Sequence, residues 1–417
     1  MKIVKISMLL VAAAVVIFGL GTTSFAFHSG GVAECMGCHN IHDAQSTSAL
    51  LMAQDVTSTC ANASCHGAPS AGSYHILTPQ ASMGAGVPPL NKTPGGDFGW
   101  LLKTYTWSPR TGTSETELGE THGHNVVALD LAGYIADPVN LTPPGGGTMD
   151  ATVFSCNSCH DQHGQMRRMS DGSVSTTGAP IIGSGSYTSS VLPAAGQAVG
   201  MYRLLRGQYS GAGDGGVSFT TNFNGVVAST YNKAEGTDGR TAMAYGAGVS
   251  DWCATCHPDM LSATSAKHTH TTNQGFSSTL AAAYNAYVGS GVTGNPDFDT
   301  YAPWANDNVT DLATLKADAI NQARDASTTS KVMCLSCHRA HASGFDFMAR
   351  SNMTGNEFVW VDGIFPGTDA TGQSSQAKYA QGRTVAETAA AYNKKATELP
   401  GYSTYQRSLC NKCHAKD

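Results

Sequence analysis

Charged side chains and long hydrophobic runs are both scarce in this chain of 417 residues. Asp, Glu, Lys and Arg make up only 13% of it, and beyond residue 26 no apolar stretch is long enough to span a bilayer as a helix. The few charges sum to a formal net charge of −6. This balance argues against nucleic acid and anionic lipid as partners, because both carry negative charge themselves.

No cysteine is left over for a disulfide, a zinc site or a nucleophile, because a single motif uses all 12 of them. They form six pairs, and a histidine directly follows the second cysteine of each pair. Five pairs read Cys-x-x-Cys-His, and the second in the chain reads Cys-x-x-x-x-Cys-His. Numbered one to six in chain order, the motifs are Cys35, Cys38 and His39; Cys60, Cys65 and His66; Cys156, Cys159 and His160; Cys253, Cys256 and His257; Cys334, Cys337 and His338; and Cys410, Cys413 and His414.

A cysteine pair followed by histidine is the signature of covalent c-type haem attachment. The two thiols form thioethers with the porphyrin vinyl groups, and the adjacent imidazole becomes the proximal ligand of the iron. A zinc site, a redox dithiol or a disulfide framework would leave the repeated histidine unexplained. In motif two, we expect the two extra residues to bulge outward while both thiols still reach the porphyrin. The sequence therefore predicts a hexahaem cytochrome with six covalently attached haem c groups.

The first 26 residues have the features of a secretory signal. Lys2 and Lys5 form a positive start, residues 8–20 are apolar, and Ser24-Phe25-Ala26 fits a cleavage site. We expect the mature protein to be a single hexahaem domain, residues 27–417, that is exported and either soluble or assembled on the cell surface. The alternative is an uncleaved anchor. Removal of the two lysines takes the formal net charge from −6 to −8.

The expected fold is a multihaem cytochrome of mostly coil and turns, with short helices and very little sheet, wrapped around six haems. Glycine is frequent, at 47 residues, and few segments have a sustained amphipathic pattern. Three segments have the spacing of apolar residues that predicts helices, namely 279–288, 311–326 and 384–399. Rigid apolar porphyrins replace most of the protein core in this interpretation, so haem binding and folding are expected to be coupled.

Nine histidines lie outside the motifs, and six of them would suffice to give every iron a second imidazole. Three of the nine follow a motif histidine at a spacing of three: His42, His163 and His341, after motifs one, three and five. None can bind the iron of its own motif, because the two axial ligands approach from opposite porphyrin faces. Each is therefore free to bind a neighbouring haem, unless it is a solvated surface residue.

The other histidines are either candidate distal ligands of iron or residues with no predicted role in ligation, called surface spares here. His75, His124 and His268 are candidate distal ligands, and His28 is either a ligand or an ordinary residue of the chain start. His122 and His270 each lie two positions from another histidine and are predicted to be surface spares. The methionines have no fixed offset from the motifs and are expected to be packing residues.

Several segments resemble the hexahaem outer-surface cytochromes of metal-reducing bacteria, which polymerise into conductive filaments. These segments are FHSGGVAEC (27–35), TPGGDFGW (93–100), KTYTW (103–107), CLSCHRAHASGFD (334–346) and LCNKCHAKD (409–417). The resemblance covers nearly the whole mature chain. The sequence departs from the family at the longer motif two.

The resemblance implies six bis-histidine haems in one continuous chain, with identical subunits joined head to tail. It implies electron exchange with periplasmic or outer-membrane cytochromes and with external acceptors such as metal oxides, electrodes or partner cells. It further implies that His42 binds the fifth haem of the neighbouring subunit. Matching positions are retained by His28, His75, His124, His163, His268 and His341, so seven candidates compete for six irons.

If His42, after motif one, binds the fifth haem of a neighbouring subunit, it binds the haem two places earlier in the continuous chain of haems. Applied to the other two such histidines, this gives what is here called the two-haem rule. His163, after motif three, should then bind haem one, and His341, after motif five, should bind haem three. The histidines of the loops would serve haems two, four and six.

Two other classes of function are open at this point. A monomeric periplasmic electron shuttle or store would use the same haems without a filament. A multihaem oxyanion reductase would need an iron with a vacant position, whereas every motif here ends in histidine and further histidines are abundant. We therefore predict an electron carrier without catalytic residues.

Overall fold

The structure is a computed structural model of the chain. It describes residues 35–46, 49–67, 75–91, 93–227, 243–261, 272–286, 303–320, 326–353 and 362–392.

Several predicted features lie outside the described residues. They are the signal of residues 1–26 and the candidate ligands His28 and His268, together with His270. The whole of motif six, Cys410, Cys413 and His414, also lies outside them, so the attachment of the sixth haem by Cys410 and Cys413 and its ligation by His414 stay predictions.

The described residues form short helices and very short strands. The α-helices are α2 (Cys35–Cys38), α3 (Val56–Cys60), α4 (Cys156–Cys159), α5 (Val249–Ala254), α6 (Pro258–Leu261), α7 (Ser278–Ala286), α8 (Leu312–Ile320), α9 (Cys334–Cys337), α10 (Ala377–Ala380) and α11 (Val385–Ala391). The 3-10 helices are η1 (Gln80–Ser82), η2 (Phe98–Leu102), η3 (Gly119–His122), η4 (Ala151–Val153), η5 (Tyr202–Leu204), η7 (Asp346–Met348) and η8 (Gly372–Ser375). The strands are β1 (Tyr105–Trp107), β2 (Glu115–Glu117), β3 (Arg167–Met169), β4 (Val174–Ser175), β5 (Ala198–Gly200), β6 (Gly225–Val226), β7 (Ala244–Tyr245), β8 (Ala305–Asn306) and β9 (Ser330–Lys331).

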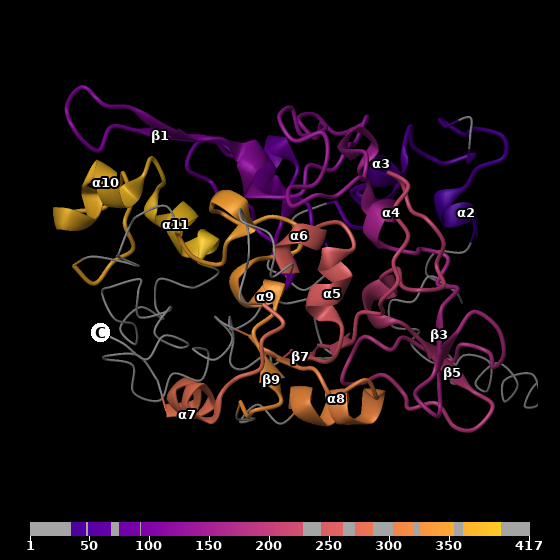
Figure 1. Cartoon of the computed structure of the whole chain (residues 1–417). Helices are drawn as coiled ribbons and strands as arrows, with labels where there is room; N and C mark the ends of the chain where they lie inside the picture. Colours follow the sequence, from indigo (N-terminus) through magenta and orange to yellow (C-terminus); the bar gives the residue numbers. More distant parts are fainter. Residues whose placement is uncertain are drawn as a thin grey trace, which may run out of the picture.

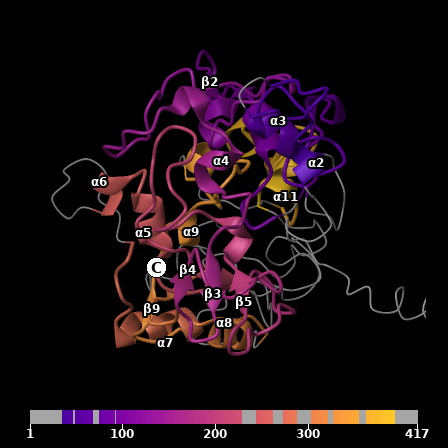
Figure 2. The ribbon, with the colours of Figure 1, turned by 90° about the vertical axis from the view of Figure 1, so that its right-hand side faces the viewer.

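The architecture confirms a fold of turns and short helices with little sheet. Helices α7, α8 and α11 lie where the apolar spacing predicts them. None of the helices in the described ranges is long and apolar enough to cross a membrane. Figures 1 and 2 both show α2, α3, α4 and α11 in the upper part, and α7 and α8 in the lower part.

Three small sheets tie distant segments together. Strands β1 and β2 form an antiparallel hairpin, and β3 pairs with β4 and β5. The four-stranded sheet has the order β6-β7-β8-β9, in which only the β7–β8 pair is parallel. Helix α8 lies against this sheet because Leu312, Leu315 and Ala319, spaced three and four apart, bury one face on Val226 and Ala244.

Two larger apolar clusters pack against motif cysteines. One joins residues from Ala61 to Tyr392 and packs around the partly buried Cys159 and Cys256. The other is rich in aromatic residues, in which the rings of Phe219 and Trp252 stack with centroids 4.5 Å apart. Motif cysteines therefore lie at the edges of the apolar clusters, where a porphyrin would extend the buried surface.

A buried carboxylate, Asp97, organises the turn before η2. It accepts hydrogen bonds from the backbone N–H groups of Thr78 (2.9 Å), Asn91 (3.0 Å) and Gly99 (2.7 Å), and from the Thr78 hydroxyl (2.6 Å). Its exposed fraction is 1%. Asp97 thus joins three loop segments that have little regular structure of their own.

Replacement of Asp97 by alanine should destabilise the fold strongly. Three buried backbone donors would lose their acceptor, at a cost of about 1–3 kcal/mol each, so we expect a loss of about 3 kcal/mol or more in the free energy of unfolding. Denaturant unfolding of the haem-loaded protein, followed by circular dichroism, measures this. Asp171→Ala is the matched control, since Asp171 is exposed and caps only its own turn. Equal stability of the two variants would contradict the assigned role.

Candidate haem-binding sites

Each of motifs one, three and five forms a single helical turn, α2, α4 or α9, that ends at the motif histidine. The histidine N–H donates to the carbonyl of the first cysteine, at 2.8 Å for His39, 2.9 Å for His160 and 3.0 Å for His338. The same bond closes motif four at His257, at 3.1 Å. One turn therefore brings both thiols and the imidazole to the same side of the backbone. The cysteines of the described ranges are all free thiols.

Motif two reaches the same closure despite its two additional residues. The N–H of His66 donates to the carbonyl of Cys60 at 3.1 Å, and Cys65 N–H donates to the Asn62 carbonyl at 3.0 Å. The extra residues lie in the turn between the cysteines. This geometry agrees with an outward bulge.

Successive motifs lie next to one another in chain order. The pKa of the Cys60 thiol is raised chiefly by a hydrogen bond with Cys156 and then by burial, which places motif two beside motif three. In the same way the pKa of the Cys253 thiol is raised chiefly by a hydrogen bond with Cys334 and then by burial, which joins motifs four and five. Weaker electrostatic effects, secondary to burial, link the remaining neighbours: Cys38 with Cys65 and Cys159 with Cys256.

The histidines of motifs one, three, four and five share a kind of backbone partner that the sequence analysis missed. In each case Nδ1–H donates to a carbonyl oxygen, and this leaves Nε2 for a metal. The acceptors are Ala49 O at 2.7 Å for His39, Arg203 O at 2.8 Å for His160, Pro144 O at 2.8 Å for His257 and Phe347 O at 2.7 Å for His338. Every residue has a carbonyl, so no side-chain pattern identifies these acceptors.

At motifs one, three and five the acceptor belongs to a repeated four-residue segment, here called the strap: residues 49–52, 203–206 and 347–350. The second strap residue has a positive φ, at 52° for Leu50, 52° for Leu204 and 57° for Met348. The carbonyl of this second residue accepts a hydrogen bond from the backbone N–H of the residue that directly follows the motif histidine. The backbone N–H of the fourth strap residue donates to the carbonyl of the second motif cysteine. The same three motifs, one, three and five, are followed by the histidines His42, His163 and His341, so the strap and the His-x-x-His spacing recur together.

The fourth strap residue distinguishes motif one from the other two. Arg206 and Arg350 donate from Nε to the carbonyl of the residue after the first cysteine, Asn157 or Leu335, both at 2.6 Å. Strap one has Met52 at this position. Among the three straps, arginine side chains therefore bind the attachment turns of motifs three and five, whereas strap one has no arginine at this position.

Three motif histidines face a second imidazole across a similar gap. The distances between ring centroids, with the angles between ring planes, are 6.4 Å and 6° for His39–His163, 6.4 Å and 49° for His160–His341, and 6.2 Å and 28° for His124–His257. Direct stacking would bring rings closer than this.

These separations fit a metal ion between the two rings. Two metal–nitrogen bonds of about 2 Å each, plus roughly 1 Å from each nitrogen to its ring centre, separate the centroids by roughly 6 Å. Free thiols, an Nδ1–H anchored to a carbonyl and opposed imidazoles together meet the requirements of c-type haem attachment. The residues present therefore fit haem c.

Backbone hydrogen bonds link the segments around Gly95, His124 and His341, and so place two of the distal imidazoles. The N–H of His341 donates to the Gly95 carbonyl at 2.7 Å, and the His341 carbonyl accepts from the N–H of His124 at 2.9 Å. Nδ1 of His124 lies 2.8 Å from the Ala340 carbonyl. A Cβ at Gly95 would lie 2.7 Å from the His341 ring, so only glycine allows this close approach.

Two of the distal imidazoles, those of His341 and His124, are kept in the neutral form that can bind a metal. Burial, followed by the neighbouring His160, lowers the pKa of His341 to about 3. Burial and then His257 lower the pKa of His124 to about 4. An imidazolium cannot ligate iron, so this environment favours ligation near neutral pH.

The structure brings His163 to motif one, His341 to motif three and His124 to motif four. The first two contacts are those that the two-haem rule expects, and the third gives a loop histidine to an even-numbered motif. His75 is half-buried, and its neighbour Ile76 donates to the His66 carbonyl at 2.9 Å. His42 is exposed, and within the described residues its imidazole faces no second imidazole.

The prediction for His122 was wrong, because this residue is fully buried rather than a surface spare. Its Nδ1 lies 3.0 Å from the Trp100 carbonyl and its Nε2 lies 2.7 Å from Oε1 of Glu117. Both ring nitrogens face oxygen atoms, so neither is available to an iron. Glu117 also pairs with Arg383. Burial alone would raise the pKa of Glu117, but His122 and Arg383 outweigh burial and lower it.

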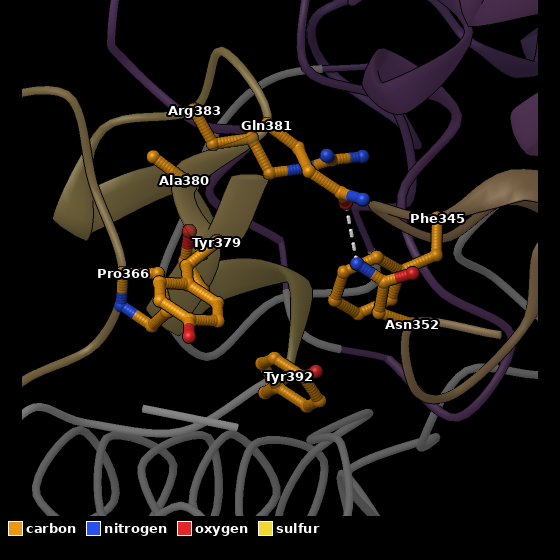
Figure 3. A pocket seen from close by; sticks show the side chains of 9 residues that line it. Phe345, Asn352, Pro366, Tyr379, Ala380, Gln381, Arg383 and Tyr392 are labelled. Atoms are coloured by element: carbon orange, nitrogen blue, oxygen red, sulfur yellow. Dashed lines mark hydrogen bonds between the residues drawn. The ribbon is translucent and has the colours of Figure 1, made fainter. Parts of the chain in front are cut away.

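A small pocket near the end of the described chain is unrelated to the motifs. It lies between Phe345, Asn352 and the residues around α10 and α11, and Asn352 donates to Gln381 across it (Figure 3). No motif cysteine or histidine of the described ranges lines this pocket. It therefore does not belong to the haem sites.

The attachment turns, the anchored proximal imidazoles and their opposed partners define a multihaem c-type cytochrome. No family model matches the chain. The chain is 42% identical over 441 residues to C-type cytochrome OmcS of Geobacter sulfurreducens, and the match covers all of both proteins.

Two solved filament structures of the same relative match the fold. Cryo-EM of the OmcS nanowires from Geobacter sulfurreducens matches with a TM-score of 0.77 and 40% identity, over 94% of this chain and 100% of that chain. The Outer Membrane Cytochrome S Filament from the same organism matches with a TM-score of 0.79 and 42% identity over the same shares. The chain belongs to the OmcS family of outer-surface c-type cytochromes.

Loss of His163 should expose one iron. In His163→Ala the haem of motif one would lack the imidazole opposite His39, and we expect a high-spin signal from one haem with the other signals retained. Electron paramagnetic resonance and absorption after addition of carbon monoxide measure this. Gln162→Ala is the control, because it changes the neighbouring residue and leaves the ring pair intact. A fully low-spin His163→Ala protein that binds no carbon monoxide would contradict the pairing.

Proposed function

We propose that this protein carries electrons outside the cell through six bis-histidine haem c groups, as the subunit of a head-to-tail conductive filament. The observation that carries the proposal is the set of opposed imidazoles at motifs one, three and four. Metal oxides, electrodes or partner cells would accept the electrons. Periplasmic or outer-membrane cytochromes would supply them.

The ligand arrangement favours electron transfer over catalysis. Haem iron supplies a one-electron couple. With an imidazole on each face, a bound iron would keep both ligands in both oxidation states and would leave no position open to a substrate. A backbone carbonyl orients the proximal ring at motifs one, three, four and five, and the distal rings of His124 and His341 are desolvated by burial. These features support an electron carrier rather than an oxyanion reductase.

The order of the motifs supports a continuous path. Thiols of motifs one to five neighbour one another pairwise in chain order, and helices α3 and α4, and α5 and α9, pack together. No motif is set apart from its neighbours among the described residues. Electrons would therefore pass along the chain from motif to motif, and the sixth haem, attached by Cys410 and Cys413 with His414 as proximal ligand, would end the path.

The two-haem rule supports a filament. His163 faces motif one and His341 faces motif three, each reaching back two motifs. His42 follows motif one, so no earlier motif exists in its own subunit. We propose that His42 binds the fifth haem, held by Cys334, Cys337 and His338, of a neighbouring subunit. A head-to-tail contact that does not close generates an open filament, as in the OmcS structures.

The remaining ligands follow by elimination within the proposal. With His42, His124, His163 and His341 assigned, haems two and six take their second imidazoles from His28, His75 and His268. One of these three stays unused. Residues 1–26 would be removed on export, and the mature domain 27–417 would fold around the haems.

His42→Ala should abolish the filament. The variant would leave the fifth haem of the next subunit without its second ligand, so we expect monomers with one high-spin haem. Electron microscopy and size-exclusion chromatography of the secreted protein measure assembly. Asp43→Ala, at the neighbouring exposed position, is the control and should form normal filaments. Unchanged filaments of His42→Ala would refute the shared ligand.

A further inference from the structure

The three straps have the same backbone bonds but different side chains at their first residue. This residue, whose carbonyl accepts the proximal Nδ1–H, is Ala49 at motif one, Arg203 at motif three and Phe347 at motif five. Only the central strap places a permanent cation at this position, since arginine stays protonated in proteins. The strap comparison therefore singles out the third site as electrostatically different.

The side chain of Arg203 is held beside this site. Its backbone N–H donates to the Ser186 hydroxyl at 2.8 Å. Its guanidinium carbon lies 5.3 Å from the centre of the Tyr187 ring and 5.8 Å from that of Tyr202, within the range of cation–π contacts. Phe347, the counterpart in strap five, instead has an exposed fraction of 64%.

One guanidinium nitrogen of Arg203 still lacks an acceptor. Nη2 is buried, and no hydrogen-bond partner lies near it in the described part of the chain. A buried charged donor without an acceptor is costly, so a carboxylate is expected opposite it.

We propose that Arg203 is a positioning residue for haem three, pairing through Nη2 with a propionate carboxylate and raising the reduction potential of that haem above those of haems one and five. The proposal rests on the function proposed above. A nearby cation favours the reduced iron, which carries one positive charge fewer than the oxidised iron. Straps one and five have no cation at this position, so the effect would be specific to the centre of the chain.

Redox titration of the haem-loaded, full-length protein tests the proposal. In Arg203→Gln one of the six transitions should move to lower potential by at least a tenfold change in its equilibrium constant, about 59 mV for one electron. Arg203→Lys keeps the charge and should retain most of the native potential. Arg110→Gln removes a charge from an exposed turn and should leave all transitions in place.

The reciprocal variant uses the repeat as an internal control. Phe347→Arg places a guanidinium at the equivalent position of strap five, and it should raise the potential of one other transition. A native titration curve for Arg203→Gln, a uniform shift of all transitions, or equal curves for Arg203→Gln and Arg203→Lys would overturn the role of Arg203. A protein mass that shows fewer than six porphyrins would instead count against the proposed function.

Discussion

The hydrogen bond from the proximal Nδ1–H to a backbone carbonyl is the interaction on which the described haem sites depend. It fixes which nitrogen carries the proton and directs Nε2 away from the strap. His39, His160, His257 and His338 all make this bond, at 2.7–2.8 Å. The bond requires a carbonyl turned toward the imidazole; at His39, His160 and His338 a strap with a positive-φ residue supplies it, and at His257 Pro144 does. These conformations are costly for Leu50, Leu204 and Met348, which indicates that the rest of the site holds them in place.

The opposed imidazoles add a second constraint, because each pair joins distant parts of the chain. In the holoprotein, His341 would tie motif five to the haem of motif three, and His163 would tie motif three to the haem of motif one. A chain with so little regular structure gains its long-range order from such ties and from the buried networks around Asp97 and Glu117. In the holoprotein, six covalent porphyrins would reinforce the same ties. Electron transfer and folding would then depend on the same residues.

Sequence reasoning predicted much of this arrangement, because cysteine and histidine are scarce and their spacing is chemically restrictive. The attachment motifs one to five and the three longer helices follow from spacing, and the ring pairs of His163 and His341 follow from the two-haem rule, which also rests on the family resemblance. The strap acceptors could not be predicted in this way, since every residue type has a backbone carbonyl. His122 was misplaced because its burial depends on Glu117 and Arg383, which approach it only in the folded chain.

A density map of the haem-loaded protein that resolves each iron and its two axial nitrogens tests the central claim most directly. The account predicts that His39 and His163 share one iron, that His160 and His341 share another, and that His124 and His257 share a third. An iron of motif one ligated by any histidine other than His163, or of motif three by any other than His341, would contradict it.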